Sequence, residues 1–372
     1  MIKVGITGQD GFIGQYLYQV LGLFPEEFER IDFQKDFFND QYQLNDFVRS
    51  CDVIIHLAAM NRHPDAELIY QTNIDLVNQL VNALEAVNSK AHVLFSSSAQ
   101  EEQENLYGKS KIAGRIKLAA WAKASGGIFT GMVIPNVFGP FCKPYYNSFI
   151  ATFSHQLIHH QQPAVEIDAV VPLIYVGDVV QVILNQIRIH QGIAALKIKA
   201  THKLKVSAIL NLLKTYQTQY VVNGIIPELT DPFQINLFNT FRSYLDVKHH
   251  FPAKFTKHTD ARGNFTEVIR SKVGGQVSFS TTLPGIIRGN HFHTRKIERF
   301  AVIKGKALIQ LRKIGTTEII DLYLDGAEPA YVDMPIWYTH NIKNIGNEEL
   351  YTNFWINEFF DPNDSDTYYE GV

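Results

Sequence analysis

Residues 285–305 have the sequence GIIRGNHFHTRKIERFAVIKG, in which two histidines and a glutamate lie between glycines. His291 and His293 are two positions apart, so in a β-strand their side chains point to the same face. Glu298 follows after a short turn, and a returning strand would bring its carboxylate alongside the imidazoles. Groups that converge in this way are typical ligands of a divalent transition metal. The stretch therefore predicts β-structure and a metal site, and a solvated strand edge is the alternative for the histidine pair alone.

A later segment supplies a fourth candidate ligand, His340. Together the spaced residues resemble the two signature motifs of the cupin family: Gly285, His291, His293, Glu298 and Gly305, then Pro335, His340 and Asn344. The first motif matches throughout. The second departs from the family pattern, because Gly326 lies too far before Pro335 and Trp337 stands where a glycine is usual. The resemblance implies a small β-barrel in which the three histidines and the glutamate bind a divalent metal, with zinc expected.

Composition limits the class of protein. The chain has 372 residues, which suggests about two domains, and its 46% hydrophobic and 19% charged residues are typical of globular proteins. A net charge of −3 gives no long-range attraction to nucleic acid or to an anionic membrane. Cys51 and Cys142 are the only cysteines, no apolar run could span a bilayer, and the first predicted strand leaves no room for a signal peptide. We therefore expect a cytoplasmic protein without nucleic-acid or membrane partners.

The beginning of the chain predicts a dinucleotide site. Residues 3–7 are typical of a buried strand, a glycine-rich turn follows, and a helix is expected to begin near Phe12. Glycines let the backbone approach a pyrophosphate, and the helix N-terminus offers unpaired N–H groups to it. The residues of this turn expected to contact the cofactor are Gly8, Gln9, Gly11, Phe12, Ile13 and Gly14.

The second predicted strand, residues 29–33, bears on the choice between NAD and NADP. Asp32 lies near its end, where a carboxylate would hydrogen-bond the ribose 2′-hydroxyl of NAD. Lys35 could instead meet the 2′-phosphate of NADP. A solvated loop for both is the alternative, so the sequence leaves the cofactor open.

Strands and helices then alternate. Residues 52–59 read as a strand that runs into a turn of small residues, and Leu57, Ala58 and Ala59 are expected beside the cofactor. Residues 72–87 have helical periodicity, and residues 92–95 form a strand with serines 96–98 at its carboxyl end. This order predicts an α/β fold of the Rossmann type, a doubly wound parallel sheet with ligands outside the carboxyl ends of its strands.

Tyr107 and Lys111 are four residues apart and would share one face of a helix. A lysine ammonium near a phenol lowers the pKa of the tyrosine, which suits proton transfer to a carbonyl oxygen. With the glycine turn and the serines, this pair resembles the extended short-chain dehydrogenase/reductase (SDR) family over roughly residues 1–240. The resemblance implies Ser98 to polarise the carbonyl, with Ser97 in reserve, Tyr107 to pass the proton, and Lys111 to tune Tyr107 and hold the nicotinamide ribose.

Candidate substrate contacts lie in both halves. The segment around Asn136 resembles the start of the sugar-nucleotide pocket of extended SDR members, although Met132 and Val133 stand where an arginine is often found. Lys143 and Asn147 are possible phosphate or uridine contacts, with a solvated loop as the alternative. In the second half, Arg288 and Lys296 are candidates for substrate anions and Tyr338 for proton transfer, with solvation or packing as the alternatives.

The pattern changes near residue 247. Helices are expected at residues 206–216 and 233–244, residues 245–258 read as a linker, and only short strands follow. We therefore predict two domains, residues 1–246 for the NADP-binding reductase and residues 247–372 for the metal-binding barrel.

The combination of an SDR domain with a cupin domain resembles CapF-type enzymes, a family of bacterial capsule synthesis. The phrases that carry the resemblance are Tyr107-Gly-x-Ser-Lys111, Cys142-Lys-Pro, Gly289-Asn-His291, Tyr338-Thr-His-Asn341 and Phe360-Asp-Pro-Asn-x-x-Asp-Thr-Tyr368. It implies a homodimer and two reactions on a UDP-linked 4-keto-6-deoxy-N-acetylhexosamine. The cupin domain would epimerise C3, and the SDR domain would reduce the C4 ketone with NADPH. The product would be UDP-2-acetamido-2,6-dideoxy-L-talose, a precursor of UDP-N-acetyl-L-fucosamine.

Two rival functions remain open at this point. One is an NAD-dependent 4-epimerase or 4,6-dehydratase with a structural cupin domain, but Ala99 and Gln100 stand where dehydratases usually carry an Asp-Glu pair. The other is a non-catalytic NADP-sensing regulator, which often loses the tyrosine and lysine that are present here.

Overall fold

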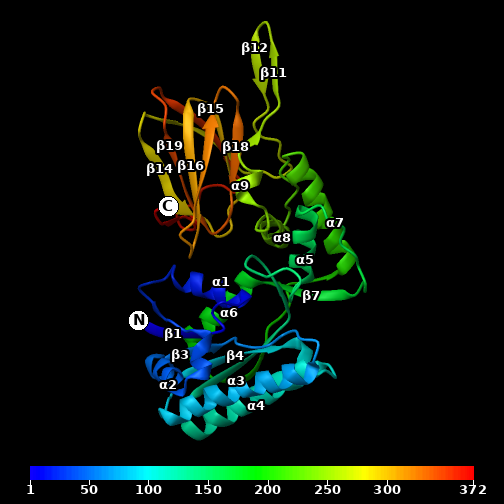
Figure 1. The fold of residues 1–372 in the computed structure, drawn as a ribbon, viewed down its shortest axis with the longest axis vertical. Coiled ribbons are helices and arrows are strands. Elements are labelled where there is room, and N and C mark those ends of the chain that lie inside the picture. The colour runs from blue at the N-terminus through cyan, green and yellow to red at the C-terminus, as the bar shows by residue number, and fades with distance from the viewer. The chain divides into compact units, whose positions relative to one another are not determined.

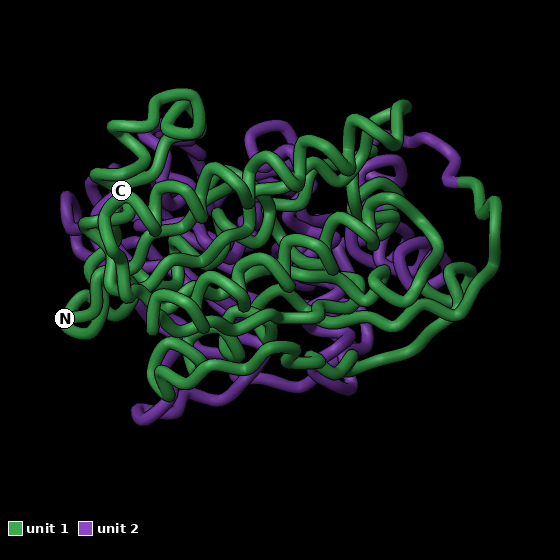
Figure 2. Tube along the Cα trace, turned by 90° about the horizontal axis from the view of Figure 1, so that it is seen from below, with its two compact units in different colours: residues 1–153, 164–209 green, residues 154–163, 210–372 purple.

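The computed structural model describes residues 1–372 as two compact units (Figure 2). The first unit comprises residues 1–153 and 164–209, and the second comprises residues 154–163 and 210–372. Residues 210–246, which we expected to belong with the first domain, pack within the second unit. None of the helices combines the length and the apolar character that a membrane span requires.

A parallel sheet forms the centre of the first unit, as predicted. Its strands lie in the order β2-β1-β3-β4-β5-β8, and every neighbouring pair is parallel. The bounds are β1 (Ile2–Thr7), β2 (Phe28–Ile31), β3 (Val53–His56), β4 (His92–Ser98), β5 (Ile128–Ile134) and β8 (Ile193–Lys197). A smaller sheet contains β6 (Asn136–Phe138), β7 (Val170–Tyr175) and β9 (His202–Lys205).

Helices cover both faces of the parallel sheet, which makes the fold doubly wound (Figure 1). Helices α1 (Phe12–Leu21) and α6 (Val176–Ile189) pack on one another, and α3 (Ala66–Ala86) packs between α2 (Gln41–Ser50) and α4 (Leu106–Ser125). Short helical turns η1 (Lys35–Asn39) and η2 (Ala99–Glu102) follow β2 and β4. The apolar faces of α2, α3 and α4 share one core with the strands, and Leu80, Leu84 and Leu118 are fully buried there.

Two boundaries differ from the predictions. The helix expected at residues 72–87 begins earlier, at Ala66, because the Asp65 side chain accepts hydrogen bonds from the backbone N–H groups of Glu67 and Leu68 and caps the helix. Strand β2 ends at Ile31, so Asp32 lies just beyond the strand.

The second unit is an antiparallel barrel, as the cupin resemblance implied. Its two five-stranded sheets have the orders β10-β18-β15-β20-β13 and β17-β16-β19-β14-β21. The bounds are β10 (Ala253–Lys254), β13 (Gln276–Thr282), β14 (Ile287–Phe292), β15 (Glu298–Lys304), β16 (Lys306–Lys313), β17 (Ile319–Asp325), β18 (Ala330–Met334), β19 (Tyr338–Asn344), β20 (Leu350–Ile356) and β21 (Tyr368–Tyr369). Side chains of both sheets meet in one apolar core, so the sheets pack face to face. A separate hairpin, β11 (Lys257–Asp260) with β12 (Gly263–Thr266), projects from the barrel (Figure 1).

The predicted linker is an ordered part of the barrel. Helix α9 (Val247–His250) lies within it, and Val247 and Phe251 are buried in the barrel core. The other helices are α5 (Phe149–Ile158), α7 (Val206–Tyr216), the π-helical η3 (Gln217–Val222) and α8 (Pro232–Arg242). The prediction of a linker was wrong because the mixed basic and aromatic composition of residues 245–258 did not indicate that Val247 and Phe251 are buried in the barrel core.

A buried ion pair of the barrel also contacts the segment that follows η3, and we expect its loss to destabilise the second unit. Arg299 donates to both carboxylate oxygens of Asp333, at 2.7 and 2.9 Å, and to the carbonyl of Gly224 at 3.0 Å. Asp333→Ala would leave the guanidinium buried without its counter-ion and lower the free energy of unfolding by about 3–5 kcal/mol. Guanidinium denaturation would measure the loss, and Asp260→Ala, which breaks an exposed pair with Arg262, should leave stability nearly unchanged.

Candidate functional site

The glycine turn of the first unit has the close backbone packing that a dinucleotide fold requires. Gly8 has a φ of +76°, and a Cβ there would lie 2.7 Å from the backbone nitrogen of Ala58. A Cβ on Gly14 would lie 2.3 Å from the carbonyl oxygen of Gly8. Gly11 caps α1 without a side-chain hydrogen bond, so the first N–H groups of the helix have no side-chain partner. The turn therefore presents bare backbone donors of the kind that hold a pyrophosphate.

The remaining predicted cofactor residues lie close to this turn in the chain or in the sheet. Gln9, Phe12 and Ile13 belong to the turn and the start of α1, and residues 57–59 follow β3, which pairs with β1. Asp32 is exposed and accepts a hydrogen bond from the Tyr18 hydroxyl at 3.2 Å. Lys35 begins η1 and is also exposed. A carboxylate and a cation are thus both available to a ribose or its phosphate.

Ser98, Tyr107 and Lys111 come together at the junction of β4, η2 and α4. The Asn105 side chain accepts from the Gly108 N–H at 2.7 Å and starts α4, which carries Tyr107 and Lys111 on one face. The Ser98 hydroxyl hydrogen-bonds with Tyr107. Lys111 is 3% exposed, and its ammonium nitrogen lies 5.6 Å from the centre of the Tyr107 ring.

The protonation of this group differs from our expectation. Burial raises the pKa of Tyr107 to about 12, with a contribution from Tyr146, and the hydrogen bond from Ser98 lowers it only in part. Burial also lowers the pKa of Lys111 to about 8, although the Glu101 carboxylate opposes the shift. The net shift of the Tyr107 pKa is therefore upward, opposite to the lowered value that we expected, because desolvation is the dominant cause. At neutral pH Tyr107 carries its proton and is ready to donate it.

Glu101 and Arg115 are functional neighbours that sequence reasoning missed. Arg115 donates to both Glu101 carboxylate oxygens, at 3.0 and 2.9 Å, and the Ser97 hydroxyl also donates to this carboxylate. Ser97 therefore faces away from Ser98 and is already engaged, which favours Ser98 as the acting serine. Because the Glu101 carboxylate already has two hydrogen-bond partners, it is not available as a catalytic acid or base. The contact could not be predicted from sequence, because fourteen positions separate Glu101 from Arg115 and only the packing of η2 against α4 brings them together.

His56 is a buried neighbour of Lys111. Its Nδ1 is 2.6 Å from the Thr7 hydroxyl oxygen, and its ring stacks on Phe95 with centroids 5.7 Å apart. Burial and the neighbouring Lys111 lower the pKa of His56 to about 3. The ring is therefore neutral and adds no second positive charge beside Lys111.

The predicted substrate contacts of the first unit are exposed. Asn136 lies on β6, where its side-chain amide donates to the Pro172 carbonyl at 3.3 Å. Lys143 and Asn147 lie in the exposed segment before α5. All three roles in substrate binding stay predictions.

The four predicted metal ligands converge in the second unit. His291 is on β14, Glu298 begins β15, His340 is on β19, and His293 follows β14. One ligand atom from each of the four lies within 4.8 Å of the others. A Glu298 oxygen is 3.4 Å from His293 Nε2 and 3.3 Å from His340 Nε2. These three buried atoms have no hydrogen-bond partner of good geometry, and such a donor set fits a divalent cation.

The electrostatics keep Glu298 and His291 in the forms that can bind a metal. Burial alone would raise the pKa of Glu298, but the His293 and His340 imidazoles hold it well below its usual range. Burial and the two other imidazoles lower the pKa of His291 to about 4, so this ring is neutral at pH 7. His291 is also the least buried of the four, which places the accessible side of the centre next to it.

Outer contacts fix two of the imidazoles. Nδ1 of His293 lies 2.6 Å from the carbonyl oxygen of Asp366, and Nδ1 of His340 lies 3.2 Å from that of Tyr338. Donation from Nδ1 leaves Nε2 of each ring as the ligand atom, as metal sites require. Asp366 is a further residue whose role sequence reasoning missed, because the resemblance of the tail phrase gave no indication that it contacts a metal ligand.

The other predicted residues of the barrel have mixed outcomes. Lys296 is buried and donates to the Ser365 carbonyl at 2.6 Å, so it ties down the C-terminal tail, and its contact with substrate anions stays a prediction. Arg288 is exposed and donates to Thr282 Oγ1 and to the Thr281 carbonyl, both at 3.1 Å. The Tyr338 ring packs against the barrel core, and burial raises its pKa. The roles of Arg288 and Tyr338 in the reaction stay predictions.

Comparison with known proteins matches both halves of the chain. Residues 4–192 match the NAD dependent epimerase/dehydratase family, and residues 258–368 match the polysaccharide biosynthesis C-terminal domain. A Pseudomonas aeruginosa protein named UDP-2-acetamido-2,6-beta-L-arabino-hexul-4-ose reductase is 30% identical over 379 residues, with 99% of this chain and 98% of the relative covered. The crystal structure of the capsular polysaccharide assembling protein CapF from Staphylococcus aureus is 32% identical over the whole of both chains, with a TM-score of 0.64.

The chain belongs to the CapF-type family. This confirms the resemblance and the fold class that the sequence indicated. Over 59% of its length, the chain also shares its fold with 82% of RMD from Pseudomonas aeruginosa, at 20% identity and a TM-score of 0.53.

Burial of Lys111 predicts a conflict between stability and activity in this CapF-type protein. Its pKa of about 8 lies below the ordinary value of 10.5, so the unfolded chain binds more protons between these pH values and stability rises with pH there. Lys111→Met should therefore raise the free energy of unfolding at pH 7 by on the order of 1–3 kcal/mol, a gain that shrinks as the pH rises from 8 to 10.5.

Guanidinium denaturation across this pH range would measure the effect. Lys109→Met on the exposed side of α4 is the matched control and should change little. A Lys111→Met variant that is less stable than the wild type at pH 7 would contradict this prediction, because it would show that contacts of Lys111 outweigh the cost of burying its charge.

Proposed function

We propose that this protein is a bifunctional nucleotide-sugar enzyme of surface-polysaccharide synthesis. The barrel epimerises C3 of a UDP-2-acetamido-2,6-dideoxy-4-hexulose, and the SDR domain reduces the C4 ketone with NADPH. The product is UDP-2-acetamido-2,6-dideoxy-L-talose, a precursor of UDP-N-acetyl-L-fucosamine. The observation that carries the proposal is that one chain contains both a Ser98–Tyr107–Lys111 group and a buried cluster of three histidines and a glutamate. Its 30% identical full-length relative is named a UDP-hexulose reductase.

The protonation of the SDR group supports reduction. NADPH, when bound on the glycine turn, supplies the hydride for C4. Tyr107 holds its proton at neutral pH and can give it to the O4 alkoxide that forms. Ser98, bonded to Tyr107, orients the phenol toward the carbonyl oxygen. Lys111, with a pKa of about 8, is mostly charged at neutral pH and stabilises the phenolate that remains.

The barrel site supports proton exchange at C3. That carbon is adjacent to the C4 ketone, so its proton becomes acidic when the enolate oxygen is stabilised. His291, His293, Glu298 and His340 would hold a divalent ion, which we propose is zinc, and the ion supplies Lewis acidity to a substrate oxygen. Tyr338 is our candidate for proton transfer, and exposed Arg288 is our candidate for the substrate phosphates.

The remaining assignments complete the proposal. The functional domains are residues 1–246 and 247–372, which agree with the matched ranges 4–192 and 258–368, although residues 210–246 pack with the barrel unit. We further propose a cytoplasmic homodimer, since cupin barrels commonly pair and the chain has two cysteines without a disulfide.

A 4,6-dehydratase is disfavoured by the surroundings of Ser98. That reaction needs a free carboxylic acid and base near C5. Ala99 and Gln100 follow the serine, and the first carboxylate after it in the chain, Glu101, is bound by Arg115 and Ser97. A 4-epimerase, the other rival, would recycle its NAD and leave NADPH unconsumed.

The reaction can be tested with the UDP-4-keto-6-deoxy-N-acetylhexosamine substrate in deuterated water. We expect stoichiometric oxidation of NADPH and one deuterium at C3 of the product, measured by absorbance at the nicotinamide band and by proton NMR. Oxidation without C3 label would leave a plain ketoreductase and remove the epimerase from the proposal.

Tyr107→Phe should separate the two reactions. We expect NADPH oxidation to fall about 10²- to 10⁴-fold, because the acid that protonates O4 is lost. Deuterium exchange at C3 should continue, since the barrel supplies its own groups. Tyr42→Phe, at an exposed position of the same unit, is the control. Loss of exchange together with reduction would contradict two independent sites.

His291→Ala should remove the metal and stop C3 exchange. Deleting one of four ligands leaves a site open on its accessible side, so we expect a clear drop in bound zinc, measured by elemental analysis after dialysis. His258→Ala on the projecting hairpin is the control. Full metal content in the His291 variant would show that the ligand set is wrong.

A further inference from the structure

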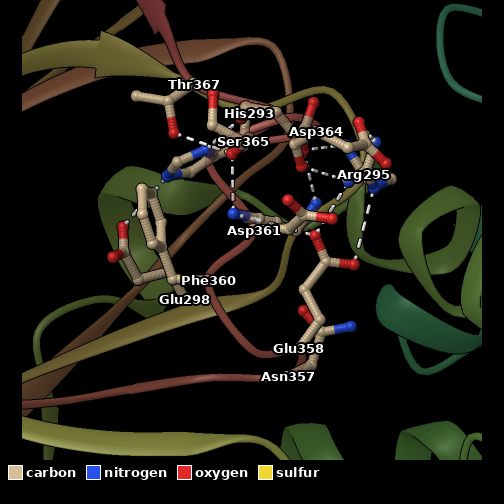
Figure 3. A network of polar contacts seen from close by, with 12 residues as sticks. His293, Arg295, Glu298, Asn357, Glu358, Phe360, Asp361, Asp364, Ser365 and Thr367 are labelled. Atoms are coloured by element: carbon tan, nitrogen blue, oxygen red, sulfur yellow. Dashed lines mark hydrogen bonds and ion pairs between the residues drawn. The ribbon is translucent and has the colours of Figure 1, made fainter.

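The C-terminal segment of residues 358–369, here called the strap, folds back onto the loop that joins β14 to β15. In Figure 3, Arg295 of that loop lies between Glu358 and Asp364 of the strap, and dashed lines mark their ion pairs. Lys296 donates to the Ser365 carbonyl, and β21 at the end of the strap pairs with β14. The strap is thus attached on both sides of the metal-binding loop.

Asp366 is the most unusual residue of the strap. It is 4% exposed although it is an aspartate, and its φ of +41° lies in the region that non-glycine residues rarely adopt. A buried carboxylate is costly unless its oxygens accept hydrogen bonds. The surroundings of Asp366 must therefore supply donors.

Those donors all come from the loop between two metal ligands. The Asp366 carboxylate accepts from the N–H and hydroxyl of Thr294, at 3.0 and 2.7 Å, and from the N–H groups of Arg295 and Lys296, both at 3.0 Å. His293 immediately precedes these residues, and Glu298 follows them after one position. One carboxylate thus fixes the backbone that connects two ligands.

The main chain of Asp366 acts on a ligand directly. Its carbonyl oxygen accepts from Nδ1 of His293 at 2.6 Å, which directs Nε2 of that ring toward Glu298, 3.4 Å away. The Asp366 carbonyl thus fixes the tautomer and the orientation of the His293 ring, and the Asp366 side chain fixes the loop that follows this ring. Partners of this kind typically contribute 10- to 100-fold to metal affinity.

We infer that Asp366 is a positioning residue of the metal centre, and that the strap completes the site from a part of the chain far from the ligands. The inference rests on the proposed metal site. Asp366 is not one of the four proposed ligands; it acts through His293 and through the loop of residues 294–297. The competing role is a simple anchor for the tail, which would affect stability but not the metal.

The test compares Asp366→Ala with Asp361→Ala in the full-length protein. Asp361 belongs to the same acidic strap, but its carboxylate accepts only from the local Asn363 N–H. Zn²⁺ affinity would be measured by competition with a chelating indicator, starting from metal-stripped protein. We expect Asp366→Ala to bind Zn²⁺ about 10- to 100-fold more weakly and Asp361→Ala to match the wild type.

A second variant and a spectroscopic measurement separate positioning from folding. Thr294→Val removes one hydrogen bond to Asp366 and keeps the side-chain volume, so it should give a smaller loss of affinity in the same direction. The visible spectrum of the Co²⁺-loaded protein reports ligand geometry, and we expect its bands to shift in Asp366→Ala. Circular dichroism of the metal-free variants would check the fold.

The outcomes are distinct. Weaker Zn²⁺ binding with a shifted Co²⁺ spectrum in a folded variant supports the inference. Unchanged affinity and spectrum, with only a lower melting temperature, would show that Asp366 is a tail anchor while the metal site stands. If neither the wild type nor any variant binds Zn²⁺, the proposed metal site and the inference both fail.

Discussion

Removal of charged groups from water is the constraint on which both sites depend. Glu298 and Lys111 are almost completely buried, and an isolated buried charge is too costly to keep. The two sites answer this constraint differently. In the barrel, imidazoles converge on the Glu298 carboxylate and keep it ionised. Beside β4, Lys111 has no carboxylate within hydrogen-bond distance, so burial lowers its pKa to about 8. A small change of pH above neutral then changes its protonation.

Each fold supplies the geometry that this chemistry needs. In the parallel sheet, β1, β3 and β4 end at the same edge, which brings the glycine turn, residues 57–59 and Ser98 together. In the barrel, β14 and β19 pair so that His291 lies opposite His340, and β15 supplies Glu298 from the other sheet. Strand pairing therefore sets the positions of the reactive groups, and loops such as residues 294–297 only adjust them.

Local pattern allowed much of this to be predicted, and long-range contacts account for most of what was missed. Glycines beside a strand, histidines at a spacing of two and the Tyr107–Lys111 pair act within short segments, so their elements could be identified from sequence. The contacts of Lys296 with Ser365 and Asp366 could not be predicted, because the loop and the strap lie about seventy residues apart in the chain. The Tyr107 pKa was mispredicted because burial is a property of the whole unit.

The order of the two proposed reactions follows from the chemistry of the ketone. Proton exchange at C3 requires the C4 carbonyl, because only an adjacent carbonyl makes that proton acidic. Reduction removes the carbonyl and, with a protonated Tyr107 as donor, converts the oxygen into a hydroxyl. Epimerisation must therefore precede reduction, and reduction ends it. Under this proposal, a chain that carries both sites would couple a reversible exchange to a step that consumes NADPH. The reductase would remove whichever C3 epimer it accepts and draw the equilibrium toward that product.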